Sequence, residues 1–77
     1  MKTPILLKNK GCLIDGDALT CVWYPTYDDS GNYVYYRMDL DFLTEHGVLQ
    51  QKLYYASIEL AMEDYNQLIN IFIKDGD

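Results

Sequence analysis

Basic residues are scarce in this chain of 77 residues, which has 6 Lys and Arg against 12 Asp and Glu and a net charge of −6. From Asp15 to Glu45 there are seven acidic residues and a single basic one, Arg37. Direct binding to nucleic acid depends on Lys and Arg that neutralise phosphates, so we expect no nucleic-acid partner. The negative charge either serves solubility alone or attracts a basic protein surface and speeds association with it.

Long hydrophobic runs are also lacking. Only three apolar residues, Ile5 to Leu7, precede Lys8, which is too short for a signal peptide. No segment approaches the ~20 apolar residues that span a membrane. We therefore expect a cytoplasmic protein with no membrane partner, in which Cys12 and Cys21 are free thiols. If Gly16-Asp17 forms a two-residue turn, Cys12 lies directly opposite Cys21.

The common catalytic and cofactor motifs are missing. The sequence has no CxxC pair, no GxSxG nucleophile motif and no glycine-rich phosphate loop. We predict a protein that is not an enzyme and holds no cofactor or metal. The alternative is a small metal-dependent enzyme. Asp39 and Asp41 would share one side of a strand, and Glu45 with the only histidine, His46, would complete a ligand and acid/base set.

The clearest pattern present is an amphipathic helix over residues 57–74. Ser57 is a good N-cap, and no Gly or Pro interrupts the helical periodicity until Gly76. The predicted apolar face comprises Ile58, Ala61, Met62, Tyr65, Leu68, Ile69, Phe72 and Ile73, and the polar face Glu59, Glu63, Gln67, Asn70 and Lys74. Leu60 and Ile71 lie on the polar side and flank Asp64. They are either scattered surface residues or a second, narrow contact stripe for a partner.

The strongest hairpin signal joins residues 18–25 to residues 33–40 through a polar loop. A five-residue loop over 28–32 gives a register that puts four pairs on the core face: Thr26 with Val34, Tyr24 with Tyr36, Val22 with Met38, and Thr20 with Leu40. On the opposite face Trp23 would lie across from Arg37, near Tyr35. A one-residue slip would exchange the faces and bury Trp23; both alternatives stay open.

The remaining segments complete the predicted sheet. Residues 4–14 read as strand with a break at 9–11, residues 15–17 as a tight turn, and residues 41–47 as a connection, with one helical turn closed by Gly47 as an option. Residues 48–56 read as a strand with Leu49, Leu53 and Tyr55 on one side. The fold expected is a single α+β domain over residues 1–77. It has a small antiparallel sheet of three or four strands in meander order and one C-terminal helix packed on one face.

These features predict a small, acidic, non-catalytic protein-binding module that occupies a basic surface of a nucleic-acid-binding partner. Eight tyrosines suit strands and binding surfaces. In size and charge the chain resembles inhibitors carried by phages and mobile elements, such as anti-CRISPR proteins and DNA mimics, although no motif carries this resemblance. The predicted partner-binding residues are Trp23, Tyr35 and Arg37 as anchors, with Asp28, Asp29 and Asp39 steering the approach. The alternative is a self-associating structural or accessory subunit that uses the second helix stripe or an exposed sheet edge.

Overall fold

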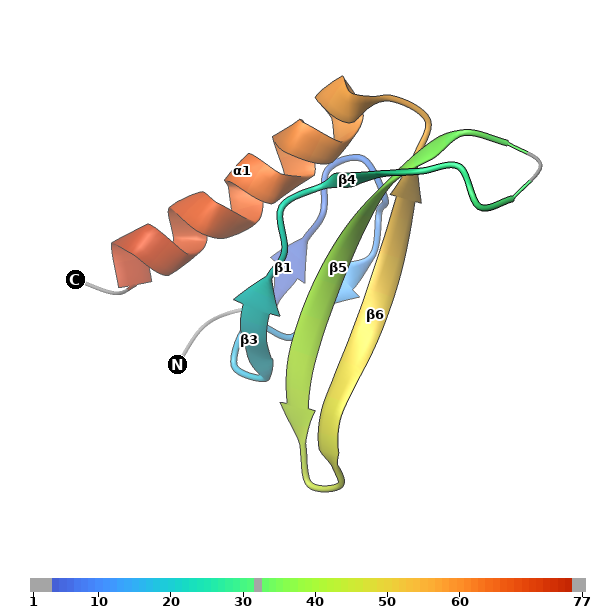
Figure 1. Ribbon diagram of the computed structural model, residues 1–77. Coiled ribbons are helices and arrows are strands. Elements are labelled where there is room, and N and C mark those ends of the chain that lie inside the picture. Colours follow the sequence, from blue (N-terminus) through green and yellow to red (C-terminus); the bar gives the residue numbers. More distant parts are fainter. Residues whose placement is uncertain (1–3, 32, 76–77) are drawn as a thin grey trace.

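The structure, a computed structural model, describes residues 4–31 and 33–75, and side chains as far as Ile71. It confirms the predicted α+β class, with a four-stranded antiparallel sheet, a separate two-stranded sheet and a C-terminal helix (Figure 1). The elements in chain order are β1 (Ile5–Leu6), β2 (Leu13–Ile14), β3 (Leu19–Val22), β4 (Thr26–Asp28), β5 (Tyr35–Thr44), β6 (Gly47–Tyr55) and α1 (Ile58–Asp75).

The central strand of the larger sheet is β5. It pairs with β6 on one side and with both β3 and β4 on the other. The chain leaves the sheet between β3 and β4, at Trp23 to Pro25, where the buried Pro25 has no N–H to give to a strand ladder. The predicted meander is therefore present, with its first strand broken into two short pieces.

The predicted register of the first hairpin is wrong. Thr26 pairs with Arg37 instead of Val34, and Val22 pairs with Leu40 instead of Met38. The break at residues 23–25 and a register shift between Leu19 and Cys21 each add one residue to the outer strand relative to β5. The connecting loop covers residues 29–34 instead of 28–32. The partner of Val22 on β5 differs from the predicted one by two residues, an even number. The face of β5 that carries Met38 and Leu40 therefore still points to the core, as predicted.

The predicted connection over residues 41–47 is also wrong, because β5 continues to Thr44. A two-residue turn, Glu45–His46, follows, and β6 begins at Gly47, whose φ of +116° suits glycine. Pairing then runs without a register shift from Thr44 with Gly47 to Tyr36 with Tyr55. The strand predicted over residues 48–56 is confirmed. The β5–β6 hairpin projects well beyond the helix (Figure 1), which leaves its far end exposed.

The predicted break at residues 9–11 is a turn that joins β1 to β2. The Leu7 N–H donates to the Cys12 carbonyl at 3.0 Å, and the Gly11 N–H donates to the Leu7 carbonyl at 2.9 Å. Because β2 pairs with β1 rather than with β3, Cys12 does not lie opposite Cys21 as the turn prediction required. Both cysteines are free thiols.

The helix begins as predicted. The Ser57 hydroxyl accepts a bond from the Leu60 N–H at 3.3 Å, which caps the first turn. Ala61 and Leu68 are fully buried, whereas the predicted apolar residues Phe72 and Ile73 lie outside the described side chains. Ala61 and Leu68 belong to the hydrophobic core, which comprises Ile5, Leu7, Ile14, Leu19, Met38, Leu40, Tyr55, Ala61 and Leu68. Within the described residues, no helix is long and apolar enough to cross a membrane.

The second helix stripe contacts the chain's own β1–β2 turn. Asp64 is 0% exposed, and its carboxylate accepts bonds from the Asn9 N–H at 3.1 Å and the Tyr55 hydroxyl at 2.7 Å. Asn9 in turn donates to the Leu60 carbonyl at 3.0 Å. Gln67, predicted on the solvent side, bonds to the backbone of Leu6 and Lys8. The contact stripe that the sequence indicated is thus intramolecular.

Candidate binding surface on the open face of the sheet

One face of the larger sheet carries most of the predicted site residues. Side chains alternate along a strand, so Arg37, Asp39 and Asp41 point away from the buried Met38 and Leu40. Both α1 and the β1–β2 hairpin pack on the Met38 side, because their buried residues form a single cluster with it. We call the opposite side, which presents the odd-numbered residues of β5, the open face.

Arg37 is held by carboxylates at the centre of the open face. Its Nη1 lies 3.1 Å from Asp28 Oδ2, and its Nε lies 3.0 Å from Asp39 Oδ1 in an ion pair without hydrogen-bond geometry. Ser30 donates to Asp28 through its hydroxyl at 2.6 Å and its N–H at 3.0 Å. The Ser30 bonds, and then the nearby Arg37 charge, lower the pKa of Asp28. Of the predicted site residues, Arg37, Asp28 and Asp39 are therefore fixed to one another.

Trp23 is exposed at one end of this ion-paired row. Its side chain is 51% exposed, so of the two alternatives left open by the sequence the exposed one holds. Trp23 does not lie across from Arg37; its N–H bonds to the Asp39 carbonyl at 2.9 Å, and its indole Nε1 donates to Asp41 Oδ2 at 3.0 Å. Gln50 donates to the other Asp41 oxygen at 3.1 Å. Asp41 thus positions the indole, a role that the spacing of Asp39 and Asp41 alone could not reveal.

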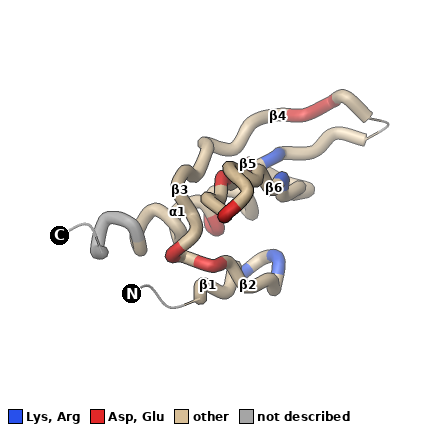
Figure 2. Tube along the Cα trace, turned by 90° about the horizontal axis from the view of Figure 1, so that it is seen from below, with Lys and Arg blue, Asp and Glu red and all other residues tan. Residues whose placement is uncertain are grey.

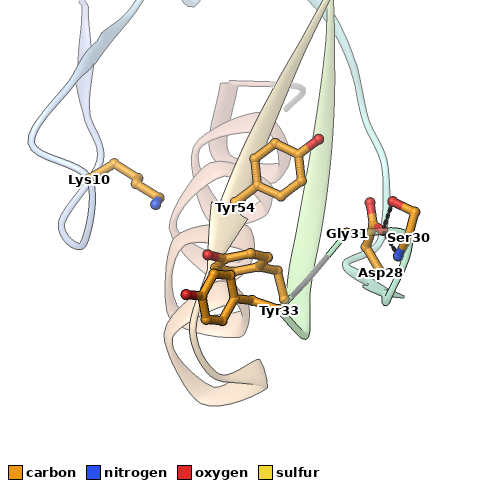
Figure 3. Close-up of a pocket in the computed structure, with 7 residues that line it drawn as sticks. Lys10, Asp28, Ser30, Gly31, Tyr33 and Tyr54 are labelled. Carbon is orange, nitrogen blue, oxygen red and sulfur yellow. Dashed lines mark hydrogen bonds between the residues drawn. The ribbon is translucent and has the colours of Figure 1, made fainter.

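Three tyrosines lie at the other end of the row. The ring of Tyr35 is 6.3 Å from that of Tyr33 and 5.9 Å from that of Tyr54, both in edge-to-face geometry. They line an open hollow of about 520 Å³, with Lys10 and Asp28 on opposite sides of the rings (Figure 3). The sequence pointed to Tyr35 but missed Tyr54, because only the pairing of β6 with β5 puts Tyr54 beside Arg37.

Charge is distributed over several parts of the molecule. Figure 2 shows acidic segments before β3 and along β4, and basic segments in the β1–β2 turn and on β5. On the open face itself, Lys52 of β6 lies opposite Asp39. Asp29, the remaining predicted steering residue, is exposed just after β4. The open face is therefore aromatic and mixed in charge rather than uniformly acidic.

The residues of the metal-dependent alternative are not brought together. Asp39 is paired with Arg37, and Asp41 is bonded to Trp23 and Gln50, while Glu45 and His46 form the exposed turn at the end of the hairpin. In the described part of the chain, no group of three or more His, Cys, Asp or Glu side chains is arranged to hold a metal ion.

No family model, curated protein or solved structure matches this chain. The exposed members of the candidate site, Trp23, Tyr33, Tyr35 and Tyr54, are large aromatic side chains on one face that the described helix and hairpin leave uncovered. Such a surface suits contact with a macromolecule better than enclosure of a small molecule, because the hollow among the tyrosines is open.

Proposed function

We propose that the protein is a non-catalytic binding module whose open face docks onto a basic surface of a nucleic-acid-binding protein. The observation that carries the proposal is the exposure of Trp23 and three tyrosines at the two ends of one uncovered face. Aromatic residues are enriched where interfaces bury most surface, and a few such anchors supply most of the binding energy.

The chemistry of the face supports a cationic partner. Lys or Arg side chains bind favourably over the faces of aromatic rings, and the tyrosine hollow offers three rings next to Asp28. The net charge of −6 favours encounter with a basic surface, and proteins that bind nucleic acid carry such surfaces. Because Arg37 is already held by Asp28 and Asp39, we assign it to supporting the face rather than to anchoring the partner.

The test is affinity capture from a lysate of the source cells with matched variants. The wild-type protein should retain a basic protein that Trp23→Ala and Tyr35→Ala lose, with retention falling as salt rises. The control is Tyr27→Ala. Tyr27 is an exposed tyrosine on the neighbouring strand whose ring packs against Tyr36, on the face opposite Tyr35. Capture that is lost equally with Tyr27→Ala, or that ignores salt, contradicts the proposal.

A further inference from the structure

The two edges of the larger sheet differ sharply. One edge consists of β3 and β4, which have four and three residues, are interrupted at Pro25, and adjoin α1 through the contact of Tyr24 with Tyr65 at 5.2 Å. The other edge is β6, which has nine residues and a continuous register with β5. Exposed edge strands are normally protected by proline, bulges or several charges, but β6 has no proline and a single charged residue, Lys52.

Two hydrogen bonds between β5 and the chain beside β3 show which backbone N–H and C=O groups of β6 are not bonded to β5. Asp39 accepts from the Trp23 N–H, and Leu43 donates to the Ala18 carbonyl, so the odd-numbered residues of β5 face β3. Its even-numbered residues therefore face β6, where they pair with residues 49, 51, 53 and 55. The N–H and C=O groups of residues 48, 50, 52 and 54 consequently point outward along the edge.

We propose that β6 pairs antiparallel with β6 of a second copy, about a two-fold axis at Gln51. This register overlaps all nine residues and gives the pairs Gly47 with Tyr55, Val48 with Tyr54, Leu49 with Leu53, Gln50 with Lys52, and Gln51 with itself. In this register the residues whose N–H and C=O groups point outward lie directly opposite one another in the two copies. Backbone hydrogen bonds can therefore form between the two strands. Four such pairs supply about eight backbone bonds, since each exchanges two.

The side chains favour the same register. Leu49 and Val48, which are 57% and 68% exposed, would meet Leu53 and Tyr54 of the other copy. A shift of one residue puts outward groups opposite groups already bonded to β5. A shift of two residues shortens the overlap from nine residues to about seven in either direction. One direction sets Gln50 against itself, and the other sets Lys52 directly against Lys52, where like charges are destabilising.

A second apolar region adjoins this edge. A hollow of about 300 Å³ lies between β2 and the sheet, and its lining includes Leu13, Gln51 and Leu53. Leu13 is 70% exposed, so the apolar surface available to a second copy continues from β6 onto β2. Edge-to-edge pairing would join the two sheets into one and leave both open faces uncovered. The inference is therefore independent of the proposed function.

The test uses the symmetry of position 51. Gln51→Lys and Gln51→Glu should each raise the dimer dissociation constant roughly fivefold, because either charge faces its own copy at the two-fold axis. An equimolar mixture of the two variants should form a heterodimer at least as stable as the wild-type dimer. Sedimentation equilibrium measures all three samples. Asn70→Lys and Asn70→Glu, at an exposed position on α1, are the controls and should leave dimerisation unchanged.

Amide hydrogen exchange provides a readout of the strand pairing itself. The amides of residues 48, 50, 52 and 54 should gain protection as protein concentration rises, whereas those of 49, 51 and 53 should be protected at every concentration. A wild-type protein that stays monomeric at the highest concentration reached overturns the proposal. So does a dimer that is weakened by only one sign of charge at position 51, or one in which both sets of amides respond together.

Discussion

At the scale of single residues, the fold depends on a carboxylate that the sequence placed on the surface. Asp64 is fully buried, and a buried charge is tolerated only when hydrogen bonds replace its water. Its two oxygens accept from the backbone of Asn9 and the hydroxyl of Tyr55. One side chain on α1 thus ties the helix to both the β1–β2 turn and the end of β6.

Removing the hydroxyl of Tyr55 tests this arrangement. Tyr55→Phe leaves a buried carboxylate oxygen without its donor, so we expect a loss of about 1–3 kcal/mol in the free energy of unfolding, measured by urea denaturation at pH 7. Tyr54→Phe, at the exposed neighbouring position, should change it by less than about 0.5 kcal/mol. Equal losses in the two variants would show that Asp64 does not depend on this bond.

The same residue predicts a pH dependence. Burial, and then the bond to Asp64, raise the pKa of the Tyr55 hydroxyl above its ordinary value. The folded protein therefore holds this proton more tightly than the unfolded chain. Tyr55 contributes its full stabilisation below about pH 10, and that contribution falls as the pH rises further. The fall in unfolding free energy above about pH 10 should be shallower in Tyr55→Phe than in the wild type.

The residue-level predictions from sequence failed where they depend on strand pairing. Trp23 and Tyr35 were predicted as exposed anchors, but the sequence left open a register slip that would bury Trp23, and only the observed pairing shows that both are exposed. The ion pair of Arg37 with Asp39 joins neighbours on one face of β5, but the ion pair of Arg37 with Asp28 requires the observed register between β4 and β5. The buried Asp64 could not be predicted either, because its partners lie 55 and 9 residues away in sequence.

At the scale of elements, α1 was predictable because its signal is local. The Ser57 cap and the 3.6-residue periodicity predicted its start and part of its buried face, including Ala61 and Leu68. Asp64 and Ile71, assigned to the polar side, also lie against the core. Leu68→Asp should unfold the protein, because it would put an unpaired charge at a fully buried position. Asn66→Asp, at an exposed position on the same helix, is the control and should stay within about 0.5 kcal/mol of the wild type. Circular dichroism during thermal unfolding distinguishes them.

The β5–β6 turn gives a second element-scale prediction. Gly47 has a φ of +116°, a conformation that is strained for any residue with a Cβ. We expect Gly47→Ala to cost about 1–3 kcal/mol in unfolding free energy. Gly31→Ala is the matched control, because Gly31 has no such φ and, like Gly47, has open space around its Cβ position. Equal stability of the two variants would contradict the strain.

Strand ends and register were less predictable than strand positions. Asp41, Phe42, Leu43 and Thr44 do not alternate between polar and apolar residues, so their pattern did not show that the strand continues to Thr44. The pairing of β3 and β4 with β5 depends on the residue at which the chain rejoins the sheet after Pro25. Contacts across the fold determine that residue, and neighbouring residues do not. Local patterns therefore identified the strands but not their partners.

At the scale of the whole molecule, one arrangement explains both proposed surfaces. The helix and the β1–β2 hairpin cover the same side of the sheet, which leaves the open face available to a partner. They leave β6 as an unpaired edge in the described structure. A partner on the face and a second copy at the edge share Tyr54 but otherwise contact different residues, so one dimer could present two open faces to a partner with a repeated basic surface.

The final prediction separates anchoring from electrostatic steering in the binding of the captured partner. Trp23→Ala should weaken binding roughly 30-fold through faster dissociation, because a buried aromatic anchor contributes about 2 kcal/mol or more.

Asp29→Asn should slow association, most visibly at low salt, because it removes an exposed charge near the open face. Glu59→Gln, which removes an equal charge from the exposed side of α1, is the control. It should slow association less, because charges farther than ~8 Å are screened at physiological salt. Surface plasmon resonance measures both rate constants. If Asp29→Asn and Glu59→Gln slow association equally at physiological salt, the acidic charge acts through the whole molecule and the docking surface is not marked by Asp29.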